Sequence, residues 1–120
     1  MSLKPKVIND FGFNPEFLRD AKNVEYTVGN PTLDASKFTK ATTVPAGTAI
    51  QRNDETGLFE LVGENDTDLV APVLTANEVL VDGENEMVPA IRKASVREEL
   101  LHGVTDSFKH ATQGRITYDI

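Results

Sequence analysis

Alternation of apolar and polar residues predicts a chain built mainly from short β-strands. Val24, Tyr26 and Val28 alternate with Glu25 and Thr27, which is the period-2 pattern of a strand with one apolar face. Further runs rich in β-forming residues follow, separated by polar turns. We expect these later strands over residues 37–43, 48–52, 58–62, 69–75, 87–93 and 115–118.

Glycine and proline residues mark the turns between the predicted strands. Gly29-Asn30-Pro31 ends the first strand, and Pro45-Ala46-Gly47 forms a turn before the strand that starts at residue 48. Asn53–Gly57 has the composition of a hairpin turn closed by glycine. Two strands contain a proline, at Pro72 and Pro89. Because proline donates no ladder hydrogen bond, each of these strands is expected at a sheet edge or a bulge.

Capping residues predict two short helices near the C-terminus. Ser95-Val96-Arg97-Glu98 has the spacing of a capping box, so we expect a helix over 95–101. Thr105 can cap a second helix that runs through Ala111 and buries Phe108. Together with the strands, these elements predict a mainly β fold with short helices, which belongs to the α+β class.

Length and cysteine content limit the fold to one modest core. The chain has 120 residues and no cysteine, so packing must hold it without disulfides or thiolate zinc sites. We expect a small, barrel-like β domain over residues 38–120, preceded by an extended N-terminal arm over residues 1–37.

The N-terminal arm contains more aromatic residues than a solvated tail usually has. Phe11, Phe13 and Phe17 are three of the six phenylalanines, and such side chains need a surface on which to be buried. Asn14-Pro15-Glu16 combines an N-cap residue, a proline and an acidic residue, which predicts a helix of one or two turns. The arm can dock on its own domain, on a neighbouring subunit or on a different protein, and the sequence leaves these three alternatives open.

The charge balance argues against nucleic acid and anionic membranes as partners. The chain carries 19 acidic and 12 basic residues, a net charge of -7, and shows no basic run that would overcome the repulsion. No apolar run approaches the roughly 20 residues that span a bilayer. The N-terminus lacks the basic-then-apolar layout of a signal peptide, so we expect a soluble protein without its own export signal.

The middle of the chain is acidic but does not match a calcium loop. Ten carboxylates and no lysine or arginine lie between Asp54 and Glu86, and Glu64-Asn65-Asp66-Thr67-Asp68 imitates the start of an EF-hand loop. That loop requires glycine at its sixth position and a bidentate glutamate at its twelfth. Here those positions hold Leu69 and Thr75. We therefore expect solvated turns, with no metal site and no cofactor.

The histidines do not form a recognisable catalytic site. His102 and His110 lack the spacing of a helical zinc pair. Ser107 is the one hydroxyl nucleophile near them, and it stands in no nucleophile elbow. Histidines at helix ends or on the surface are the better interpretation, so we expect that the protein is not an enzyme.

Five segments follow one another in an order that can be compared with known proteins. They are Pro45-Ala46-Gly47-Thr48, Leu69–Thr75, Ile91–Leu101, Gly103–Asp106 and Gly114-Arg115-Ile116. This order resembles that of the lambda-type phage head decoration proteins, over about two thirds of the chain. The resemblance implies a tulip-like, β-rich domain that forms a homotrimer.

The same resemblance implies a location and a partner. Such trimers bind the exterior of an expanded phage capsid and clamp neighbouring subunits of the major capsid protein, after synthesis in the host cytoplasm. The arm would then order on the capsid and add a strand to coat-protein β-structure. The side chains expected to make this contact are Phe11, Phe13, Phe17, Val24, Tyr26 and Val28.

Two alternative functions remain open at this point. One is a different non-catalytic virion component, such as a tail or baseplate adaptor. The other is a small hydrolase using Ser107 with His102, or a calcium-binding module using the carboxylates of residues 64–68. A solution mass discriminates among them, because a trimer supports decoration whereas a monomer or a ring of six does not.

Overall fold

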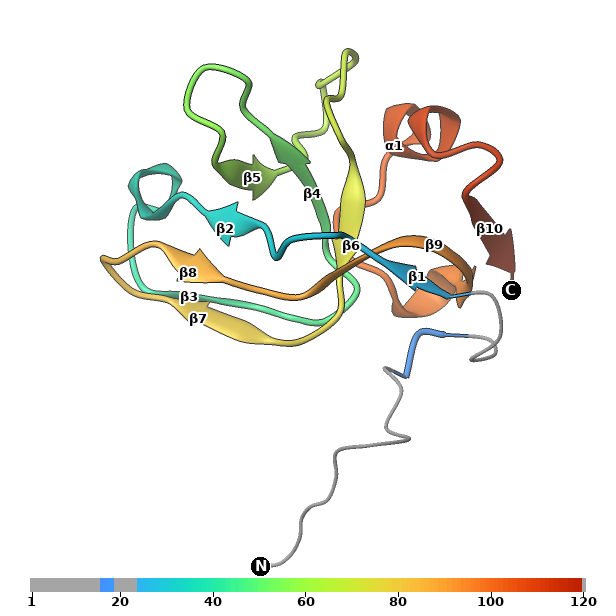
Figure 1. Cartoon of the computed structure of the whole chain (residues 1–120), viewed down its shortest axis with the longest axis horizontal. Helices are drawn as coiled ribbons and strands as arrows, with labels where there is room; N and C mark the ends of the chain where they lie inside the picture. The colour runs from blue at the N-terminus through green and yellow to red at the C-terminus, as the bar shows by residue number, and fades with distance from the viewer. Residues whose placement is uncertain (1–15, 19–23, 120) are drawn as a thin grey trace, which may run out of the picture.

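The computed structural model describes residues 16–18 and 24–119, and within them ten short strands form two sheets (Figure 1). The strands are β1 (Glu25–Tyr26), β2 (Thr32–Leu33), β3 (Thr42–Val44), β4 (Ala49–Arg52), β5 (Phe59–Leu61), β6 (Val73–Thr75), β7 (Val79–Val81), β8 (Glu86–Met87), β9 (Ala90–Arg97) and β10 (Ile116–Asp119). The helical elements are η1 (Ala35–Lys37), η2 (Glu98–Leu100) and α1 (Asp106–Ala111). The prediction of a mainly β fold with short helices is confirmed.

The larger sheet has eight strands, of which β4, β6 and β9 form the central group. Its order is β1-β9-β6-β4-β5-β2-β8, and β10 joins β9 in parallel. The smaller sheet pairs β3 with β7 in antiparallel register, with Thr43 opposite Leu80. In Figure 1 the strands β2, β3, β7 and β8 gather on one side of the molecule, and α1 and β10 lie on the other.

The central strands are buried on both faces because successive side chains enter different hydrophobic clusters. The pairs are Ala49 and Ile50 on β4, Val73 and Leu74 on β6, and Ala90 and Ile91 on β9. Ile50, Val73 and Ala90 belong to the cluster under β2, β3 and β7. The remaining three belong to the cluster under α1 and β10. Strands covered on both faces have continuous apolar sequences, which explains the unbroken run before and through β6.

Two local predictions are confirmed in detail. In the hairpin between β4 and β5, Asn53 N–H donates to Leu58 O (2.8 Å) and Gly57 N–H donates to Asn53 O (2.7 Å). Helix α1 begins after Thr105, whose hydroxyl accepts a hydrogen bond from Phe108 N–H (3.1 Å). The Phe108 side chain is fully buried, so the cap fixes the helix where its one large apolar residue meets the core.

The predicted helix over 95–101 is wrong. β9 continues to Arg97, and only a single 3₁₀ turn, η2, follows it. Ser95 and Val96 pair with Thr117 and Tyr118 of β10, and Val96 is completely buried. Tertiary strand pairing and burial therefore override the local capping signal, which is a weak preference.

The N-terminal and proline predictions also need correction. Residues 16–18 form a turn and a bridge rather than part of a helix; Asn14 and Pro15 lie outside the described residues. Neither proline sits within a strand, because β6 starts after Pro72 and a break at Pro89 divides the predicted strand into β8 and β9. β6 thus occupies a central position between β4 and β9. Strands β2 and β7 were not predicted.

The predicted boundary at residue 38 does not follow the packing. Leu33 on β2 is fully buried, and β2 pairs with both β5 and β8. Phe17 is buried in the cluster that contains Phe108. Phe17 and Leu33 thus pack in hydrophobic clusters together with residues beyond 38. The β domain therefore includes part of the predicted arm.

Candidate interaction surface

The described N-terminal residues run antiparallel along one edge of β9. Arg97 N–H donates to Phe17 O (2.7 Å), and Leu18 forms a bridge with Val96. Further along, Tyr26 lies opposite Ile91 in the β1–β9 pair. The register shifts between Glu25 and Tyr26, which is the irregularity of a β-bulge. The segment therefore adds a strand to the sheet of its own chain.

Phe17 anchors this segment in the core. Its side chain is 1% exposed and packs against the Pro45–Thr48 turn. A β-carbon built on Gly47 would lie 3.0 Å from Phe17 Cδ2 and 3.3 Å from Leu101 Cδ2. Phe17 is therefore a core residue of the chain that carries it, and its ring is not available for contact with a partner.

The Pro45–Thr48 turn is held by hydrogen bonds to β6. Thr75 is fully buried; its hydroxyl accepts from Thr48 N–H (3.0 Å) and donates to Pro45 O (2.9 Å). Its backbone carbonyl also accepts from Gly47 N–H (2.8 Å). Each bond satisfies a polar group that would otherwise be costly to bury. The turn is therefore a rigid support for Phe17. This role explains the sequence of the Pro45–Thr48 turn.

The alternating residues around β1 divide between core and solvent. Val24 packs against the main hydrophobic cluster, whereas Tyr26 is 48% exposed and Val28 is fully exposed. Glu25 pairs with Arg92 (2.5 Å) and Lys93 (3.9 Å) of β9. We call Tyr26 and Val28 the β1 surface. The predicted contact residues Phe11 and Phe13 lie outside the described residues.

A second apolar feature is a groove of about 240 Å³ between β3 and β5. Its lining includes Thr43, Pro45, Leu61, Val62 and His102. Leu61 is 41% exposed, so the groove is open to solvent. The sequence did not reveal it, because the groove forms only where two strands from different sheets approach each other.

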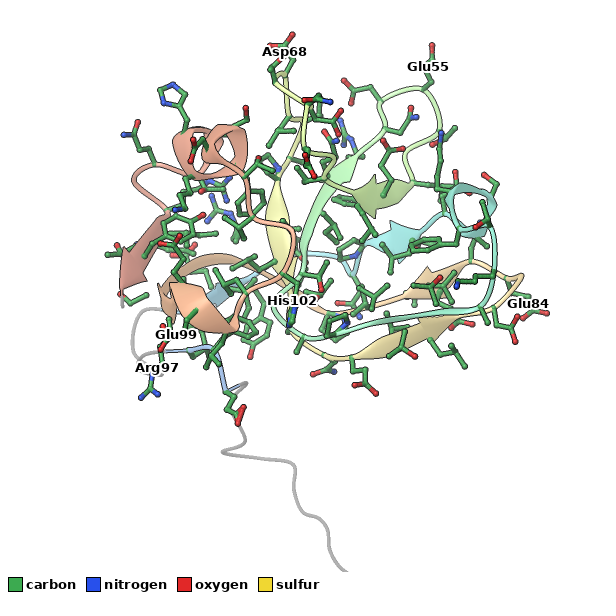
Figure 2. The ribbon with its side chains drawn as sticks, turned by 180° about the vertical axis from the view of Figure 1, so that it is seen from behind. Glu55, Asp68, Glu84, Arg97, Glu99 and His102 are labelled. Atoms are coloured by element: carbon green, nitrogen blue, oxygen red, sulfur yellow. The ribbon has the colours of Figure 1, made fainter. Side chains whose placement is uncertain are left out.

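In the acidic loops, Asp66 holds its own loop, whereas several other carboxylates point outward. Asp66 accepts hydrogen bonds from the Gln51 side-chain amide and from Gly63 N–H, both at 2.8 Å. Figure 2 shows Glu55, Asp68 and Glu84 on separate loops with their side chains directed away from the body. Within residues 16–18 and 24–119, no three acidic, histidine or cysteine side chains gather to hold a metal ion.

His102 and Ser107 are not brought together as a catalytic pair. His102 is exposed, and its backbone extends the sheet, since its N–H donates to Gly47 O and its carbonyl accepts from Ala49 N–H. Ser107 lies in the first turn of α1. Among the described residues, no hydrogen bond joins the two side chains.

Tyr118 has a shifted pKa, but its contacts are structural. Burial raises the pKa of Tyr118 above its usual value of 10.0. Its hydroxyl lies 2.7 Å from Thr112 Oγ1. Because Thr112 Oγ1 donates to Phe108 O (2.8 Å), Tyr118 is the donor to Thr112. Lys109 Nζ lies 5.8 Å from the centre of the Tyr118 ring. Together these contacts connect β10 to α1.

No family model, curated protein or solved structure matches the chain. Its function is therefore inferred from its own sequence and geometry. In the part of the chain that the structure describes, no helix is both long enough and apolar enough to cross a membrane.

Proposed function

We propose that this protein is a non-catalytic capsid decoration protein. As a homotrimer it binds the outer surface of an expanded phage head and clamps neighbouring subunits of the major capsid protein. It uses no cofactor and contacts neither nucleic acid nor membrane. The order of the five sequence segments supports the proposal, and so does the mainly β body into which they fold.

The observation that carries the proposal is the β1 surface. Tyr26 on β1 and Val28 just after it are exposed, and β1 lies at one end of the sheet order. Among the described residues β1 pairs only with β9, so its other edge presents backbone groups to a partner. An edge strand with exposed apolar side chains suits strand addition, where backbone bonds supply affinity and side chains supply register.

The rigid attachment of the N-terminal segment fits a clamping role. Phe17 is buried in the core, whereas Tyr26 is about half exposed. A load on the β1 surface would reach the core through β9, which pairs with β1 and also forms a hydrogen bond with Phe17. A binding strand that is already ordered also loses less conformational entropy than a free tail, for which ordering costs roughly 1–2 kcal/mol per residue.

Co-sedimentation with expanded, undecorated capsids of the phage that encodes the chain tests this function. The double variant Tyr26→Asp with Val28→Asp should bind at least about 100-fold more weakly than wild type, because charges would replace two apolar side chains at the proposed contact with the capsid. Circular dichroism checks that the variant folds.

Met87→Asp is the matched control. Met87 is 65% exposed and lies on β8, at the other end of the sheet order. It should bind like wild type. Absence of binding by wild-type protein would reject the function; full binding by the folded double variant would reject the β1 surface as the contact.

A further inference from the structure

An open pocket of about 400 Å³ lies between β9 and β10, and neither the β1 surface residues nor the residues of the apolar groove line it. Its lining is polar and includes two hydroxyls and two cationic side chains. The residues are Lys93, Ala94, Ser95, Gly114, Arg115 and Thr117. Because β9 and β10 are parallel, with Thr117 opposite Ser95, the two hydroxyl-bearing residues are neighbours across the strands.

Arg115 is held in place by backbone carbonyls rather than by a carboxylate. Its Nη1 donates to Arg92 O (2.7 Å) and its Nη2 donates to Pro72 O (3.2 Å). A guanidinium has five N–H donors, so these two bonds leave three. Among the side chains that the structure describes, which do not include that of Asp119, no carboxylate forms an ion pair with Arg115, although the Arg115 side chain is partly buried.

The surroundings of Arg115 carry excess positive charge. Arg92 and Lys93 share one carboxylate, that of Glu25, so these three residues together with Arg115 sum to +2. Burial and the neighbouring Arg92 both lower the pKa of Arg115. A concentration of positive charge is unusual in a chain with a net charge of -7, and an anion would relieve the repulsion.

We propose that the β9–β10 pocket binds an oxyanion, either a phosphate or a carboxylate. Arg115 and Lys93 supply the positive charge, and the hydroxyls of Ser95 and Thr117 donate hydrogen bonds. Arg115 is suited to this role because its planar fork matches both groups and its position is fixed before the ligand arrives. No residue of this site belongs to the β1 surface, although Lys93 lies opposite Glu25 of β1.

Amide NMR shifts of the full chain can be followed during titration with inorganic phosphate, with sodium chloride lowered to keep the ionic strength constant. Saturable shifts should appear at Ser95, Gly114 and Thr117. A second titration uses N-acetylglutamate amide, which offers one side-chain carboxylate. Saturation by phosphate alone identifies a phosphate ligand, and saturation by the glutamate derivative identifies a carboxylate from a protein or small acid.

Variants establish which side chains make the site. Arg115→Met should weaken the binding about tenfold or more. Because Arg115 also bonds two carbonyls, Lys93→Met provides a second variant that keeps this framework and should weaken binding in the same direction. Lys40→Met, at an exposed lysine elsewhere, should leave the affinity unchanged. Linear, unsaturated shifts with both ligands, or equal affinity in the folded Lys93 and Lys40 variants, would overturn the proposal.

Discussion

The ring of Phe17 lies directly against the backbone of Gly47. A β-carbon on Gly47 would stand 3.0 Å from Phe17 Cδ2, and Gly47 has a φ of +84°. Two independent requirements, a left-handed backbone and the absence of a side chain, therefore meet at one position. The contact connects the N-terminal segment to the turn that β6 supports.

Gly47→Ala should destabilise the protein by about 2–5 kcal/mol, the sum of left-handed strain and overpacking against Phe17. Gly83→Ala is the control, because Gly83 has a φ of +79° but open space around its β-carbon position. It should cost only the strain, about 1–2 kcal/mol. Urea unfolding measures both, and equal losses would contradict the packing role of Gly47.

Phe17→Ala should destabilise the protein by about 3–5 kcal/mol, the usual cost of emptying a buried phenylalanine site. Tyr26→Ala, in the same segment but 48% exposed, should change the free energy of unfolding by about 0.5 kcal/mol or less. Urea unfolding of both variants checks the contrast. A small loss for Phe17→Ala would mean that the segment is not anchored in the core.

Sequence patterns predicted the elements whose signals are local. The hairpin at Asn53–Gly57 and the helix capped by Thr105 depend on residues a few positions apart. The patterns failed where distant strands decide the outcome. Ser95 and Glu98 form a correctly spaced capping box, yet β10 pairs with Ser95 and extends the strand. No local signal in the chain reveals a parallel partner that lies about 20 residues away.

The candidate surface was predicted only in part. Alternation of Val24, Tyr26 and Val28 correctly indicated a strand, but not which of these residues the core would cover. Phe17 illustrates the same limit, because an aromatic residue in an arm can be buried in its own domain or in a partner. Its burial follows from the shape of the Gly47 turn, which the sequence alone does not give.

Alkaline pH should reveal the partly buried phenol of Tyr118. Because its pKa is raised in the folded state, the stability from its neutral form is fully present below pH 10.0 and is lost as pH rises through the folded pKa. Urea unfolding from about pH 8 to about pH 11 should show wild type losing stability relative to Tyr118→Phe. Parallel curves for the two proteins would contradict this assignment.

Millimolar calcium should leave the melting temperature and the solution mass unchanged. Asp66 already accepts hydrogen bonds from Gln51 and Gly63, and the loop lacks the ligands of a calcium site. A site filled 100-fold above its dissociation constant would add about 2.7 kcal/mol of stability. Thermal unfolding with calcium, and with magnesium as control, tests this; a calcium-specific rise of several degrees would contradict it.

The central claim is that trimers of this chain clamp the exterior of an expanded capsid, and cryo-electron microscopy of capsids incubated with the protein tests it most directly. The account predicts added density at the three-fold and quasi-three-fold positions, with three copies in each and the β1 surface facing the coat protein. A bare capsid exterior at saturating protein, or density confined to the tail vertex, would contradict it.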